Sequence, residues 1–132
     1  MKINAETLGG KGSIDGAVIV GTGSGPSAYL SPGTKGSATL TINKILTFKA
    51  DGSYRCDLSL GQAKADQVIA NGVTIENGAQ FVKVPEGNQA LAVGTVFTII
   101  SNTATTPING TFANLVDGST ITADAGNKFQ VS

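Results

Sequence analysis

The sequence predicts an all-β chain built from many short strands, and three observations lead to this prediction. Gly, Ser, Thr and Asn interrupt almost every window of a dozen residues, so an apolar stripe of helical period is not established. Short apolar or alternating runs recur along the whole sequence. Pairs that favour turns, such as Asn-Gly and Asp-Gly, separate many of these runs.

The expected strands are eleven short runs, each bounded by small or turn-forming residues. Val, Ile, Thr, Phe and Tyr, which favour extended backbone, are prominent in them. Eleven strands in 132 residues indicate an all-β chain. In chain order the runs cover residues 17–20, 38–42, 45–48, 54–60, 67–70, 73–75, 80–84, 95–101, 110–115, 119–123 and 128–131.

Two Asn-Gly pairs, at 71–72 and 77–78, bear on how the strands are arranged. Asn-Gly between apolar residues is a strong hairpin signal, which would make 68–84 an antiparallel meander. The pairs also recur six residues apart, each before a short apolar run, as the corners of a parallel coil do. Because stacked Asn, Thr, Val and Ile need few ion pairs, the low charge favours the coil. We therefore predict a parallel β-helix, with an antiparallel β-sandwich as the alternative.

Composition excludes several functional classes. Nine Lys plus Arg balance nine Asp plus Glu, so the chain has no charge excess that would attract nucleic acid or an acidic membrane. His is absent and Cys56 is the single cysteine, which excludes histidine triads, Cys/His zinc sites and an internal disulfide. The first residues lack a signal-peptide pattern, and no run approaches the ~20 apolar residues of a membrane helix. We expect one domain over 1–132, with any targeting segment outside this chain.

Five segments carry motifs in a fixed order: LGGKGSIDGAVIV (8–20), LSPGT (30–34), ATLTINKILTFKADGSYRCDL (38–58), ADQVIANGVTIENGAQF (65–81) and VGTVFTIISNTATTPINGTFANLVDGSTI (93–121). In this order they resemble the passengers of bacterial autotransporters and related surface proteins with autotransporter-associated β-strand repeats. The resemblance implies a right-handed parallel β-helix, a single-stranded solenoid, that is a segment of a longer exported protein. It implies an extracellular or cell-surface location and no enzymatic activity.

Two departures from that family pattern stand out. The membrane-embedded barrel of the family is absent from this sequence, and Asn43-Lys44 stands where a glycine turn is usual. The expected function is a non-catalytic structural or adhesive module that presents an extended β-helical surface. Its expected partners are carbohydrate, a surface protein, or further copies that join through exposed sheet ends.

The alternative function is that of a carbohydrate-active enzyme fragment, a polysaccharide lyase or hydrolase, which would use Arg55, Asp57 and Asp66. Strand alternation places Arg55 and Asp57 on one face, and Asp57 with Asp66 would supply paired carboxylates. The simpler interpretation makes Arg55 and Asp57 a solvated pair and Asp66 a turn residue. Cys56 is expected to point into the core as a small apolar side chain.

Cofactor and metal motifs are not expected to operate here. The run at 21–25, Gly-Thr-Gly-Ser-Gly, would need a following helix to cradle a phosphate, and Ser-Pro-Gly at 31–33 prevents one. Neither the glycine- and aspartate-rich nonapeptide nor the Asp-x-Asp-x-Asp loop that binds calcium occurs. We therefore expect a loop or β-corner at 21–25, with no cofactor and no metal.

Overall fold

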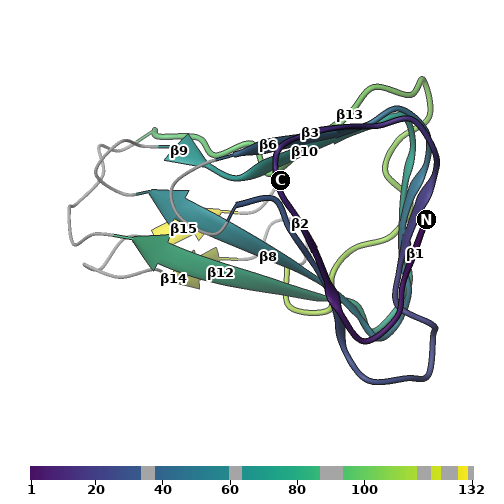
Figure 1. Cartoon of the computed structure of the whole chain (residues 1–132). Coiled ribbons are helices and arrows are strands. Elements are labelled where there is room, and N and C mark those ends of the chain that lie inside the picture. Colours follow the sequence, from purple (N-terminus) through teal and green to yellow (C-terminus); the bar gives the residue numbers. More distant parts are fainter. Residues whose placement is uncertain (34–37, 60–63, 87–93, 116–119, 123–127, 131–132) are drawn as a thin grey trace.

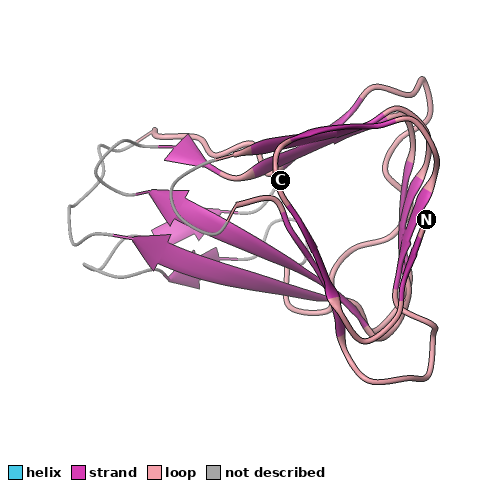
Figure 2. Cartoon of the chain, in the orientation of Figure 1, coloured by secondary structure: helices cyan, strands magenta, loops and turns pink. Residues whose placement is uncertain are grey.

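The computed structural model describes residues 1–33, 38–59, 64–86, 94–115, 120–122 and 128–130. This part of the chain forms strands, turns and loops and contains no helix (Figure 2). The strands are β1 (Lys2–Ile3), β2 (Thr7–Gly9), β3 (Gly12–Ile14), β4 (Val18–Val20), β5 (Ala28–Ser31), β6 (Thr39–Ile42), β7 (Leu46–Phe48), β8 (Gly52–Ser59), β9 (Lys64–Ala65), β10 (Gln67–Ala70), β11 (Val73–Ile75), β12 (Gln80–Glu86), β13 (Ile100–Asn102), β14 (Thr120–Thr122) and β15 (Lys128–Gln130).

Most strands belong to three parallel sheets, which lie along the three sides of a triangle in Figure 1. Sheet A has the order β1-β4-β7-β11, sheet B the order β2-β5-β8-β12, and sheet C the order β3-β6-β10-β13. Every neighbouring pair along these three orders is parallel. Two pairs are antiparallel: β8 with the short β9, and β14 with β15.

The chain visits sheets A, B and C in the same order four times, and we call each passage a circuit. Parallel neighbours need a long connection, and here the connection is the passage through the other two sheets. The sheets are separate, since no ladder joins one to another. The all-β prediction is confirmed. The alternative of an antiparallel meander over 68–84 is wrong, because β10, β11 and β12 lie in three different sheets.

Side chains from successive circuits stack on one another and form the core. In sheet B, for example, Leu8, Leu30, Tyr54 and Phe81 lie side by side in register. Burying an apolar side chain of this size contributes about 1.5–3 kcal/mol. Among the residues whose burial the structure describes, the apolar ones that are less than 2% exposed are Val18, Val20, Ala28, Leu30, Pro32, Ile42, Leu46, Phe48, Tyr54, Cys56, Val68, Ala70 and Ala79.

Four aromatic rings pack together inside the core. Phe48 meets Phe112 edge-on with ring centres 5.1 Å apart, and Tyr54 meets Phe81 in the same way at 5.9 Å. Phe48 also stacks with Tyr54 at 6.0 Å. Such pairs add stability beyond the area that they bury. The cluster joins sheets A and B to the loop after β13.

Glycine and asparagine form several corners between the sheets. Gly72 and Gly78 follow β10 and β11 and have φ angles of +105° and +107°, which an L side chain rarely adopts. The prediction that the two Asn-Gly pairs mark corners is confirmed. At the corresponding corner of the previous circuit, Asn43 donates its side-chain amide to Asp15 Oδ1 at 2.7 Å, so this corner is bonded to the circuit before it.

Some predicted strand positions are wrong. The glycine-rich start contains β2 and β3, which the alternation pattern did not indicate, and residues 110–115 form only an isolated bridge. A side chain explains the second difference. Asn114 accepts a hydrogen bond from Phe81 N at 2.8 Å and donates to Phe81 O at 2.7 Å. Its amide group therefore occupies the place that a neighbouring strand would take beside β12.

Candidate functional site

The segment from Tyr54 to Asp57 lies in the middle of β8, and its side chains differ from the predicted alternation. Tyr54 and Cys56 are completely buried, as expected for the core face. Arg55 is half-buried, with its guanidinium carbon 4.7 Å from the centre of the Tyr29 ring, a cation–π contact. Asp57 is only 4% exposed, so the expected solvated Arg55/Asp57 pair is not what the structure contains.

Asp66 is the most deeply buried carboxylate in the described part of the chain, with no exposed surface. Its Oδ1 accepts a hydrogen bond from Ala38 N and its Oδ2 accepts one from Asp57 N, both at 2.9 Å. One side chain thereby connects the starts of β6 and β10 to β8. The predicted position just before β10 is confirmed, while its burial was not predicted.

The three candidate catalytic residues are therefore held in different ways. Asp66 contacts the backbone of Asp57, whereas Arg55 packs over the ring of Tyr29. Both oxygens of Asp66 already accept backbone hydrogen bonds, which is the pattern of a carboxylate that holds the chain together. This geometry favours a structural role for Asp66.

A buried polar network surrounds Asp66. The Tyr54 hydroxyl donates to Ile99 O at 2.7 Å, and the Cys56 thiol donates to Asp66 O at 3.3 Å. Burial, together with the nearby charge of Asp66, raises the pKa of Cys56 from its ordinary 9.0 to about 12. Burial also raises the pKa of the Tyr54 hydroxyl well above its usual 10. Both groups are neutral donors at physiological pH.

We expect Cys56 to resist alkylation in the folded protein. At pH 8 a thiol with a pKa of about 12 holds almost no reactive thiolate, and the side chain is fully buried. Iodoacetamide labelling followed by mass spectrometry should be roughly a hundredfold or more slower in buffer than in concentrated urea. Equal rates in the two conditions would mean that Cys56 is accessible and that the core around β8 differs from this structure.

The glycine run at 21–25 does cradle an anion, and the anion is a side chain of the same protein. The carboxylate of Asp51 accepts hydrogen bonds from the backbone N–H groups of Thr22, Gly23 and Gly25 at 3.0, 2.6 and 3.2 Å. The Thr22 hydroxyl adds a fourth at 3.1 Å. Successive N–H groups that converge in this way form a concave anion site. The loop predicted at 21–25 is confirmed, and three of its N–H groups are occupied by Asp51.

This cradle lowers the pKa of Asp51 from its ordinary 3.8 to about 2. Partial desolvation acts to raise the pKa, and the hydrogen bonds from Thr22 and Gly23 outweigh it. Since the folded pKa lies below the unfolded one, the carboxylate stabilises the fold above about pH 4. That stabilisation is lost as the pH falls through about 2.

We expect Asp51→Asn to melt at a lower temperature than the wild type at neutral pH, because the amide is uncharged and has one acceptor oxygen. The gap between the two melting temperatures should narrow as the pH falls from about 4 to about 2. Circular dichroism melts over this pH series measure it, with Asp15→Asn as the exposed control. A gap that stays constant over the series would contradict the cradle.

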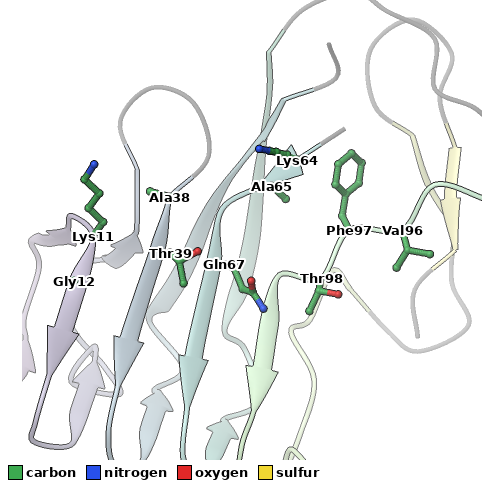
Figure 3. Close-up of a pocket in the computed structure, with 10 residues that line it drawn as sticks. All are labelled: Lys11, Gly12, Ala38, Thr39, Lys64, Ala65, Gln67, Val96, Phe97 and Thr98. Carbon is green, nitrogen blue, oxygen red and sulfur yellow. The ribbon is translucent and has the colours of Figure 1, made fainter. Parts of the chain in front are cut away.

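A groove lies at the starts of the sheet C strands, and we call it the sheet C groove (Figure 3). It is an open groove with a volume of about 780 Å³, and it is bordered by the ten residues that Figure 3 labels. Each circuit contributes to it: Lys11 from the first, Thr39 from the second, Gln67 from the third and Thr98 from the fourth. The groove thus runs across the strands, along the direction in which the circuits stack.

The border of the groove combines positive charge with apolar surface. Lys11 and Lys64 are both exposed and supply two ammonium groups, and none of the ten residues carries a carboxylate. Val96, which is 80% exposed, and the half-buried Phe97 form the apolar end. Asp66 lies between two bordering residues in sequence, yet its carboxylate is buried against the backbone. The groove therefore suits an anionic ligand that also has apolar surface.

The sequence did not predict this groove, because its residues are far apart along the chain. One signal was present in the spacing. Lys11, Thr39 and Gln67 are separated by 28 residues each, which is the spacing of register partners from β3 to β6 and from β6 to β10. A search for polar residues at this interval would have found the row once the circuit length was known.

The described residues were compared with the requirements of a metal site and of a membrane-spanning helix. Within the described ranges, no three His, Cys, Asp or Glu side chains gather so that they could hold a metal ion. The same ranges contain no helix with the length and apolar character needed to cross a membrane.

Comparisons of the chain with protein-family models, with curated proteins and with solved structures find no match in any of the three. The resemblance to autotransporter passengers stays a prediction from the sequence motifs.

Proposed function

We propose that this chain is a segment of a right-handed parallel β-helix that serves as a structural or adhesive module of a bacterial cell-surface or secreted protein. The observation that carries the proposal is the fourfold passage through sheets A, B and C with parallel pairing between successive circuits. Each circuit adds one strand to every face, so that the faces lengthen as circuits are added. Such a chain projects a long surface away from its point of attachment.

The outward row of sheet A supports an adhesive or structural role. In sheet A, Ile19, Thr47 and Thr74 each lie between two buried residues of a strand, so their side chains point outward. They are neighbours in register and carry no charge. An uncharged surface of this kind suits contact with carbohydrate, with a surface protein, or with further copies of the chain.

The competing function, a polysaccharide lyase or hydrolase, would rely on Arg55, Asp57 and Asp66. A general acid or base must reach the substrate within hydrogen-bond distance. Asp66 has no exposed surface and Asp57 very little, while Arg55 packs on Tyr29. These observations favour the non-catalytic proposal.

Two measurements test the proposal. Purified protein is incubated with acidic and neutral polysaccharides, and products are followed by chromatography; we expect no turnover. Intact cells that carry the parent protein are labelled with an antibody against this chain; we expect binding without permeabilisation. If turnover is observed and Asp57→Ala abolishes it, the chain is a carbohydrate-active enzyme fragment and the non-catalytic proposal is wrong. If the antibody labels cells only after permeabilisation, the surface location is wrong.

A further inference from the structure

We propose that the sheet C groove binds a short acidic oligosaccharide, with Lys11 and Lys64 pairing with its carboxylate or sulfate groups. This inference rests on the proposed adhesive function and names the ligand class of one site on that surface. Phe97 and the polar side chains between the two lysines would contact the sugar rings.

The dimensions of the groove suit such a ligand. It crosses four circuits, and three spacings of ~4.8 Å between neighbouring strands amount to roughly 14 Å. Its volume of about 780 Å³ falls within the range of small-ligand sites, about 300–1,000 Å³. An extended chain of a few sugar units can therefore lie along the stacking direction, across the strands.

The two lysine side chains at the border of the groove favour an anionic ligand. Lys11 and Lys64 come from the first and third circuits, so two ammonium groups stand at separate places along the groove (Figure 3). The ion pair found in the described part of the chain joins Lys49 to Glu76, and neither groove lysine takes part in it. Each ammonium has three donors for a carboxylate or sulfate oxygen.

The remaining border suits sugar rings. Thr39, Gln67 and Thr98 offer hydroxyl and amide groups, which can both donate to and accept from ring hydroxyls. Phe97 supplies an aromatic ring at one end, where the apolar face of a sugar can pack. A few polar groups beside apolar surface are typical of small-molecule sites.

The sheet itself disfavours an extended peptide as the ligand. Peptides that join a sheet do so through unpaired backbone groups at an edge. The groove crosses the starts of strands that are already paired: β6 with β3 and β10, and β10 also with β13. Nucleic acid is disfavoured as well, because two lysines on a chain without net charge provide little phosphate neutralisation.

Isothermal titration calorimetry provides the test, with two acidic probes: a short oligogalacturonate and a short heparin-derived oligosaccharide. The control ligand is the carboxyl-reduced oligogalacturonate, which keeps the sugar chain and loses the charge. We expect binding of at least one acidic probe, which identifies uronate or sulfate as the preferred anion. The reduced oligomer should bind more weakly, and added salt should weaken the acidic complex.

Protein variants locate the site. We expect Lys11→Gln and Lys64→Gln each to weaken binding roughly two- to fivefold, and the double variant roughly tenfold. Phe97→Leu should weaken the acidic and the reduced oligomer by the same factor. Lys44→Gln, an exposed lysine at a corner outside the groove, should bind as the wild type does. Circular dichroism confirms that each variant is folded.

Several results would overturn this inference. The first two are that neither acidic probe binds, or that the reduced oligomer binds as tightly as the acidic one. The third is that Lys44→Gln weakens binding as much as Lys11→Gln and Lys64→Gln do. The fourth is that a polyglutamate peptide binds as tightly as the acidic oligosaccharide and depends on the same two lysines. None of them bears on turnover or cell-surface labelling, which test the proposed function separately. Conversely, turnover together with lysine-dependent binding would overturn the non-catalytic function and leave the oligosaccharide site in place.

Discussion

Replacement of Asp66 with alanine is expected to lower the free energy of unfolding by about 2–5 kcal/mol, because the buried N–H of Asp57 and the half-buried N–H of Ala38 lose their acceptor, at up to ~3 kcal/mol for a buried group and less for a half-buried one. The affected groups belong to Ala38 and Asp57, so the loss loosens the second and third circuits together. Urea denaturation followed by circular dichroism measures the change.

Two further variants make this result specific. Asp66→Asn keeps one acceptor oxygen and should lose less stability than Asp66→Ala. Asp15→Ala removes an exposed carboxylate that accepts a hydrogen bond from the Asn43 side chain, and it should cost less than about 1 kcal/mol. If Asp66→Ala instead kept full stability and abolished a polysaccharide-cleaving activity, Asp66 would be catalytic and its structural role would be wrong.

Tyr54→Ala is expected to lower the free energy of unfolding by about 3–5 kcal/mol, the usual cost of removing a large buried aromatic side chain. The ring contacts Phe48, Phe81 and Phe112, so its loss leaves a cavity at the centre of the aromatic cluster. Urea denaturation again measures the change.

Tyr54→Phe separates the ring from its hydroxyl. This variant keeps the aromatic packing and removes the hydrogen bond to Ile99 O, which retains a bond from Val68 N at 3.0 Å. We expect a loss of about 0.5–1.5 kcal/mol, the net value of one hydrogen bond. A loss for Tyr54→Ala no larger than that for Tyr54→Phe would contradict the central position of this ring.

The sequence predicted those elements whose side chains alternate strongly. Val18–Val20, Leu46–Phe48 and Gln67–Ala70 each place apolar residues on one face, and each is a strand within one residue of its predicted bounds. The corners at Gly72 and Gly78 were predictable for a related reason, because both need a positive φ. Local side-chain pattern and backbone freedom were sufficient in these cases.

Other elements depend on contacts that local pattern does not contain. Thr7–Gly9 and Gly12–Ile14 have few apolar side chains and are strands because Ala28–Ser31 and Thr39–Ile42 pair with them. At 110–115 the apolar run predicted a strand. Instead, the Asn114 side chain forms the hydrogen bonds to Phe81 N and Phe81 O that the backbone of a neighbouring strand would form. Tertiary pairing outweighed propensity at these positions.

The candidate sites also divide into features that depend on one strand and features that depend on contacts between distant segments. Strand alternation predicted the burial of Cys56 correctly, since this depends on its own strand. The burial of Asp57 and Asp66 depends on β8, β10 and the start of β6 coming together. The anion held by residues 21–25 is Asp51, which is far along the chain and lies in the next circuit.

A crystal structure tests the central claim most directly, because the proposed function and the sheet C groove both depend on parallel circuits in one register. We predict that Leu40 lies between Gly12 and Val68, and Tyr54 between Leu30 and Phe81, with parallel neighbours spaced ~4.8 Å apart. Antiparallel pairing of 67–70 with 73–75, as in a hairpin of a β-sandwich, would contradict the account.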